Sequence, residues 1–118
     1  MGRSEKLRDG LQALVAVDEV VTHAFVANGG EGRPSKTSFW VLGLTSRNVL
    51  LATASHLVRW KVQGHVQRLP REPFADLPDG RLPGFERWTF NGLSLWLDRS
   101  SRQEAADMNE MLGGPPTP

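Results

Sequence analysis

Hydrophobic residues recur every three or four positions in two separate segments of the chain, one near each end. This spacing predicts amphipathic helices over Ser4–Val15 and Ser101–Leu112. In the second segment Ser101 and Glu104 have the spacing of a capping box, and Gly113-Gly114 followed by two prolines predicts its end. Gly10 lowers the helix propensity of the first segment. Its narrow apolar stripe indicates a helix that packs on a larger unit.

Between these segments the pattern is that of β-strands, with alternating or continuous runs of β-branched and aromatic residues. The predicted strands are Val20–Ala27, Thr37–Thr45, Val49–Ala54, His56–Gln63, His65–Leu69, Phe85–Phe90 and Leu93–Leu97. Asn91-Gly92 between the last two is a strong signal for a two-residue hairpin turn. Gly64 is predicted to break the chain between two strands, and the glycine-rich segment Gly29–Gly32 to form a mobile loop.

The segment Pro70–Gly84 contains four prolines and is predicted to be weakly structured, with a short strand near Phe74 and a turn at Pro78-Asp79-Gly80. The order of elements predicts a mainly β (α+β) fold. We expect a strongly bent antiparallel sheet or barrel of about seven strands that a C-terminal helix closes. The 118 residues are expected to form one domain over 18–112, with a helical extension over 1–17 and a disordered tail over 113–118.

Charge changes this picture, because the net charge of +1 is unevenly distributed. From Gly32 to Arg71 there is no Asp or Glu, so this stretch carries +7 and the rest of the chain −6. The pattern predicts an electropositive surface that binds an anion or a partner. Its expected residues are Arg33, Lys36, Arg59, Lys61, Arg68 and Arg71. The alternative is a solvated face that the acids of the C-terminal helix balance.

Candidate chemistry is sparse. The absence of cysteine excludes disulfides and thiolate metal sites, and His23, His56 and His65 lack the spacing of zinc ligands. A strand instead of a helix follows Gly29–Gly32, which argues against a phosphate-binding loop. The acid pairs Asp76/Asp79 and Asp107/Glu110 are typical of solvated turns and helix faces. We therefore predict no enzyme activity, no metal site and no cofactor.

The tryptophans and the N-terminal segment limit the remaining classes. The four tryptophans all fall in predicted strands, at positions typical of a core. Alternation places Trp60 on the face opposite to Arg59 and Lys61, which argues against a nucleic-acid stacking platform. No segment approaches the roughly 20 apolar residues of a membrane span, and the first residues lack the pattern of a signal peptide. The expected location is the cytoplasm, either free or peripheral to a membrane.

Two motifs resemble the pleckstrin-homology-like superfold, in particular small bacterial GRAM-like domains. Leu44–Leu51 is similar to the recurring hairpin of that family, and Asp18-Glu19-Val20-Val21 to the acidic-then-aliphatic entry into its first strand. The resemblance spans Asp18–Leu112 and implies a seven-stranded barrel whose open end the last helix fills. It also implies a non-catalytic module that binds phosphoinositides, peptides or proteins. Thr37, Ser38 and Phe39 stand where phosphoinositide-binding members carry basic residues, which argues against that ligand.

The resulting hypothesis is a non-catalytic binding module for protein–protein interaction, whose basic surface meets an acidic partner or an anionic membrane. Two alternatives remain open at this stage. One is a small β-barrel that binds nucleic acid, although nucleic acid is not the partner we expect. The other is a small ligand-binding protein or enzyme with a pocket under the C-terminal helix.

Overall fold

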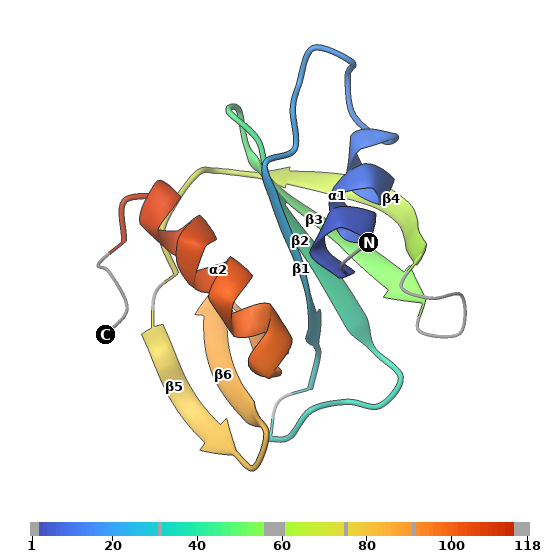
Figure 1. Cartoon of the computed structure of the whole chain (residues 1–118). Helices are drawn as coiled ribbons and strands as arrows, with labels where there is room; N and C mark the ends of the chain where they lie inside the picture. Colours follow the sequence, from blue (N-terminus) through green and yellow to red (C-terminus); the bar gives the residue numbers. More distant parts are fainter. Residues whose placement is uncertain (1–2, 31, 56–60, 75, 91, 115–118) are drawn as a thin grey trace.

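The computed structural model describes residues 3–30, 32–55, 61–74, 76–90 and 92–114, and contains two helices and seven strands in one sheet (Figure 1). The elements in chain order are α1 Arg3–Gln12, β1 His23–Asn28, β2 Phe39–Leu44, β3 Val49–Ser55, β4 Lys61–Leu69, β5 Asp76–Leu82, β6 Phe85–Phe90, β7 Leu93–Leu97 and α2 Arg99–Met111. Both predicted helices are present, and the Phe85–Phe90/Leu93–Leu97 hairpin has the predicted bounds.

The sheet is antiparallel, with strand order β4-β3-β2-β1-β7-β6-β5. Two meanders, β1 to β4 and β5 to β7, meet where β1 lies beside β7. Among the described residues, these two strands are matched at one position, Asn28 opposite Trp96. The sheet therefore separates along the rest of β1, which leaves backbone groups of that strand without a strand neighbour.

Helix α2 lies along this separation and supplies the missing hydrogen bonds (Figure 1). The Ser101 hydroxyl donates to the Val26 carbonyl at 2.7 Å, and the Glu104 carboxylate accepts from the Ala24 amide at 3.0 Å. The predicted capping box is therefore wrong. Asp98 is the N-cap and accepts from the Ser101 amide, while the two residues expected to cap the helix attach it to β1.

Each face of the β1–β4 half of the sheet carries its own core. One core contains Phe25, Leu42 and Leu51 and continues between the two meanders to α2. The other lies on the opposite face, where Leu7 and Leu11 of α1 are completely buried. A side chain at Gly43 would overlap that of Leu11, so this glycine lets α1 approach β2 closely.

Gly10 of α1 has the same role against β4. A Cβ atom there would lie 2.9 Å from a methyl carbon of Val62. The glycine that lowers the helix propensity of this segment thus provides close packing between helix and sheet. Leu14, predicted to continue the helix, lies beyond its end and is 48% exposed.

The predicted break at Gly64 was wrong. Gly64 does not separate two strands: it lies inside β4, whose pairing with β3 shifts register between Leu51 and Thr53. Residues 56–60, predicted to begin the first of those strands, lie outside the described residues. A register irregularity of this kind accommodates the residue that the local sequence marks as a break.

The segment Pro70–Gly84 is also more regular than predicted. It contains β5, and Pro78-Asp79-Gly80 lies inside that strand instead of forming a turn. The register of β5 shifts between Asp76 and Gly80, and the reversal occurs at Gly84, whose φ is +83°. Phe74 precedes the strand and is buried in the α2-side core.

The fold is thus mainly β, as predicted: a seven-stranded antiparallel sheet with a short N-terminal and a C-terminal helix. The sheet is open, because its two edge strands, β4 and β5, do not pair with each other. None of the described helices is long and apolar enough to cross a membrane. Of the predicted C-terminal tail, Gly113 and Gly114 are described and residues 115–118 lie outside the described part.

Candidate binding surface

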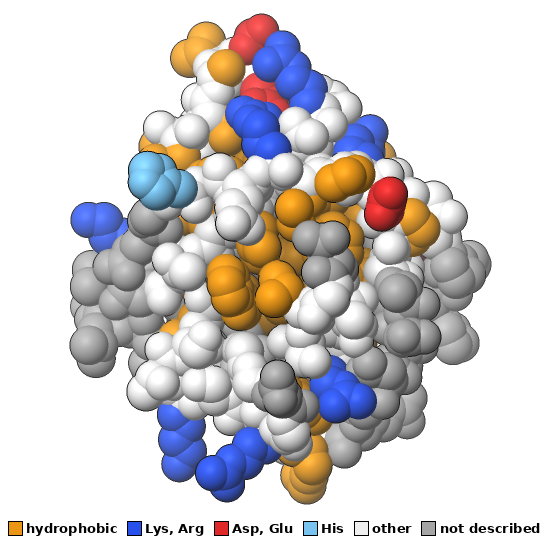
Figure 2. All heavy atoms as spheres, turned by 180° about the vertical axis from the view of Figure 1, so that it is seen from behind, with side chains coloured by type: hydrophobic (Ala, Val, Ile, Leu, Met, Phe, Trp, Pro, Cys, Tyr) orange, Lys and Arg blue, Asp and Glu red, His pale blue; other side chains and the backbone are white. Residues whose placement is uncertain are grey.

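The structure does not bring the predicted basic residues together on one surface. Arg33 and Lys36 lie in the β1–β2 loop, and Lys61 begins β4 at the same end of the sheet, opposite Ser55. Arg68 and Arg71 lie at the other end, beside the β2–β3 turn that carries Arg47. Arg59 lies outside the described residues. Figure 2 shows basic side chains toward both ends of one face, with hydrophobic side chains gathered at its centre.

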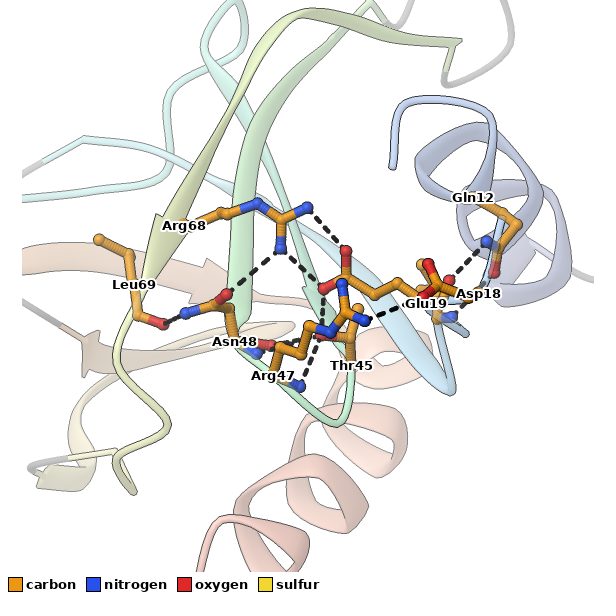
Figure 3. Close-up of polar contacts among 9 residues, drawn as sticks. Gln12, Asp18, Glu19, Thr45, Arg47, Asn48, Arg68 and Leu69 are labelled. Atoms are coloured by element: carbon orange, nitrogen blue, oxygen red, sulfur yellow. Dashed lines mark hydrogen bonds and ion pairs between the residues drawn. The ribbon is translucent and has the colours of Figure 1, made fainter. Parts of the chain in front are cut away.

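We call the end of the sheet that carries the β2–β3 turn the turn end. There the completely buried carboxylate of Glu19 binds Arg68 and Thr45 (Figure 3). Its two oxygens accept from the two terminal nitrogens of Arg68 at 2.6 and 2.7 Å, and one also accepts from the Thr45 hydroxyl at 2.8 Å. The hydrogen bonds from Arg68 and then from Thr45 lower the pKa of Glu19 from 4.5 to about 2, against the opposing effect of burial. The same contact raises the pKa of Arg68.

Neighbouring side chains hold both members of the Glu19–Arg68 ion pair in place. The side-chain amide of Gln12, the last residue of α1, donates to the Glu19 carbonyl at 2.6 Å and accepts from the Val21 amide at 2.9 Å. Arg68 also donates to the Asn48 side chain at 3.2 Å. Arg68 is therefore bound on several sides and serves the fold more than a partner.

A second, exposed ion pair lies beside the first, between Arg47 and Asp18 at 3.1 Å. Asp18 and Glu19 are thus the counter-charges at this end, whereas the sequence alternative expected them from the C-terminal helix. Sequence reasoning noted these two acids only as the entry to a strand. No local signal indicated that Glu19 would be buried against an arginine almost fifty positions away.

The opposite end is shaped by the β1–β2 loop, whose hydrogen bonds fix its path. The Asn28 side chain donates to the Ser35 carbonyl at 2.7 Å, and the Ser35 amide donates to Gly29 at 2.7 Å. The Ser35 hydroxyl oxygen accepts from the amides of Thr37 and Ser38. The described residues on either side of the glycine-rich segment are therefore hydrogen-bonded to one another, and the mobility of that segment stays a prediction.

The sheet also contacts this loop through Trp96, whose indole N–H donates to the Gly30 carbonyl at 2.9 Å. Arg87 of β6 lies over the Trp96 ring at 5.6 Å from its centre. Such a cation–π contact adds positive charge next to the loop. Arg87 lies outside the acid-free stretch, so the charge pattern of the sequence did not indicate it.

The two ends differ in how their charge is compensated. Arg47 and Arg68 are paired with carboxylates, whereas Arg33, Lys36 and Lys61 form no ion pair within the described part of the chain. All three side chains are exposed. We call these three residues the loop-end cations. At the turn end Arg71 is likewise exposed, and its contact is with the Ser46 carbonyl at 3.5 Å. The loop-end cations are thus the larger part of the predicted surface whose charge is available to an external anion.

The remaining candidates from the sequence fall into ordinary structural positions. His23 contacts the Thr22 hydroxyl at 2.9 Å, and His65 is exposed on β4; His56 lies outside the described residues. The described residues include no cluster of three or more metal-ligating side chains. Asp107 accepts from Gln103 on the outer side of α2.

Of the four tryptophans, Trp88 and Trp96 are buried and Trp40 is half-buried, as expected for core residues, and Trp60 lies outside the described residues. Among the residues that the structure describes, the Trp88 indole N–H and the side-chain amide nitrogen of Asn109 are buried without a hydrogen-bond partner. Both residues adjoin Phe74, whose ring meets Trp88 and whose amide donates to the Asn109 oxygen at 2.8 Å.

Comparison of the chain with protein-family models, curated proteins and solved structures finds no match.

Proposed function

We propose that this chain is a non-catalytic protein-interaction module whose loop-end cations dock an acidic segment of a partner protein. The observation that carries the proposal is the contrast between the two ends of the sheet. At the turn end, Asp18 and Glu19 neutralise two of the three arginines and leave Arg71, whereas the charges of Arg33, Lys36 and Lys61 are all exposed and uncompensated among the described residues.

An acidic protein segment suits this surface better than an anionic bilayer. Each basic residue near such a bilayer contributes on the order of 1 kcal/mol, so three give weak attachment unless apolar side chains insert as well. The loop residues 29–38 contain no large hydrophobic side chain that would insert. The buried or half-buried state of the described tryptophans likewise argues against stacking with nucleic-acid bases.

We also propose that the fold is pleckstrin-homology-like. It is supported by the meander of four strands followed by three, and by the last helix covering the separation beside β1. Under this interpretation the module acts by binding, and its biological role depends on the partner that carries the acidic segment.

A selection from a random peptide display library tests the proposal. We expect the wild-type protein to enrich peptides with an excess of Asp and Glu, and the Arg33→Glu/Lys36→Glu variant to lose them. Arg71→Glu/Arg47→Glu makes the same change of charge at the turn end and is expected to enrich the same peptides as the wild type. Circular dichroism establishes that each variant is folded.

Affinity and vesicle assays complete the test. A synthetic peptide from the selection should bind the Arg33→Glu/Lys36→Glu variant about tenfold more weakly than the wild type. Its affinity for the wild type should fall with increasing salt, since exposed charges are screened. Enrichment of the same peptides by both variants, or no enrichment at all, contradicts the proposal. Co-sedimentation with anionic vesicles that depends on Arg33 and Lys36, without any selected peptide, would assign the surface to membranes instead.

A further inference from the structure

The two edge strands of the sheet, β4 and β5, differ in their ability to pair with another strand. β5 contains Pro78, which has no amide hydrogen to donate to an added strand. β4 is nine residues long, contains no proline, and has no strand on its outer side among the described residues (Figure 1). An edge of this kind presents unpaired backbone donors and acceptors to an extended segment.

The side chains of β4 suit an added strand on both faces. Val62 and Val66 are half-buried against the α1-side core, and Leu69 is half-buried against the α2-side core. Lys61, His65, Gln67 and Arg68 are exposed. An extended segment along β4 would cover the remaining surface of the three apolar side chains and leave the polar ones at the rim.

Charge selects the occupant of this edge. β4 has two basic residues, Lys61 and Arg68, and no acid. Arg68 is paired with Glu19, so among the described residues Lys61 carries the unpaired charge of this strand. In an antiparallel pair of two β4 strands centred on His65, Lys61 of each copy would lie opposite Leu69 of the other and would gain no counter-charge. A segment with an acidic side chain opposite Lys61 would supply one, so an acidic segment is favoured over a second copy.

We infer that β4 receives the acidic partner segment as an additional β-strand. The inference rests on the proposed function and deepens it, because Lys61 belongs both to the loop-end cations and to the first position of β4. A segment that pairs with β4 therefore has one end beside Lys61, at the end of the sheet that carries the β1–β2 loop. Backbone hydrogen bonds would supply affinity, and the alternation of apolar and acidic side chains would supply selectivity.

The test uses the full chain, labelled with nitrogen-15, and the synthetic peptide enriched most strongly in the display selection. We expect slowed amide exchange at alternate residues of β4 and nuclear Overhauser contacts between the β4 backbone and the peptide backbone. Binding with changes confined to the β1–β2 loop, or along β5, overturns the strand-addition inference and leaves the proposed function standing. A selection that enriches no peptide overturns the proposed function itself.

A pair of identical substitutions gives an independent readout. Gln67→Glu places a negative charge on the exposed rim of β4 and is expected to weaken peptide binding several-fold through like-charge repulsion across the strands. Gln103→Glu makes the same change on the exposed side of α2 and should leave affinity unchanged. Equal effects of the two variants would contradict the inference. Analytical ultracentrifugation of the wild type alone completes the test, because a dimer that Gln67→Glu disrupts would make a second copy the occupant.

Discussion

The attachment of α2 to β1 predicts a specific loss of stability. Ser101→Ala removes the hydroxyl that donates to Val26 and leaves that buried carbonyl without its partner. The penalty for an unsatisfied buried acceptor is about 1–3 kcal/mol. Glu104→Ala leaves the Ala24 amide unpaired and removes a charged acceptor, for which we expect about 1.5–3 kcal/mol. Glu104→Gln keeps an oxygen acceptor at that position and should cost less.

Urea unfolding monitored by tryptophan fluorescence measures these free energies. Both bonds join the same helix to the same strand, so the double variant should lose less than the sum of the single losses. Gln103→Ala on the exposed side of α2 is the control, with an expected change within about 0.5 kcal/mol. A Ser101→Ala variant as stable as this control, with Glu104→Ala also neutral, would refute the role assigned to the two residues.

Three further predictions concern other parts of the fold. Leu11→Ala should lower the free energy of unfolding by about 2–5 kcal/mol in thermal or urea denaturation, because this α1 side chain is completely buried; a loss under about 1 kcal/mol would show that α1 is dispensable. Glu19→Gln should remove the part of the free energy of unfolding that depends on the ionisation of Glu19. The folded pKa of Glu19, about 2, lies below its ordinary 4.5, so its contribution is fully present above pH 4.5 and is lost as the pH falls toward 2. The free energy of unfolding, measured by urea denaturation at several pH values, should therefore fall more steeply with decreasing pH in the wild type than in the variant. An equal pH dependence in both proteins would contradict the ion pair. Gly92→Ala should cost about 1–2 kcal/mol, because Gly92 has a φ of +80°, whereas Gly32→Ala, with open space around it, should be neutral; equal effects would contradict the turn geometry.

The parts of the fold that the sequence predicted well are those that local chemistry determines. The hairpin at Asn91-Gly92 and the C-terminal helix each have a nearby signal for their turn or end. β5 was missed because Pro78 and Gly80 have the composition of a turn, and only its place at the edge of the sheet tolerates them. The cap was misassigned because the polar groups of Ser101 and Glu104 are used by β1, a contact across 75 and 80 positions.

The candidate surface shows the same limit. The acid-free stretch concentrates positive charge in the sequence, but its members occupy strands that run back and forth across the sheet. Residues of similar charge are thereby distributed to opposite ends, with Lys61 at one end of β4 and Arg68 at the other. Periodicity assigned faces to these side chains, whereas the separation of the ends and the pairing of Arg68 with Glu19 depend on tertiary structure.

The contacts between α2 and β1 also bear on how the chain reaches this fold. During synthesis the β1–β4 meander leaves the ribosome first, and its pairings are between neighbouring segments. The Ala24 and Val26 groups gain their partners only after Glu104 has emerged, 80 positions later. Contacts of such long sequence separation slow folding, and an incomplete strand edge is open to aggregation in the meantime. Nascent chains that end before α2 should therefore be the species that most require a chaperone.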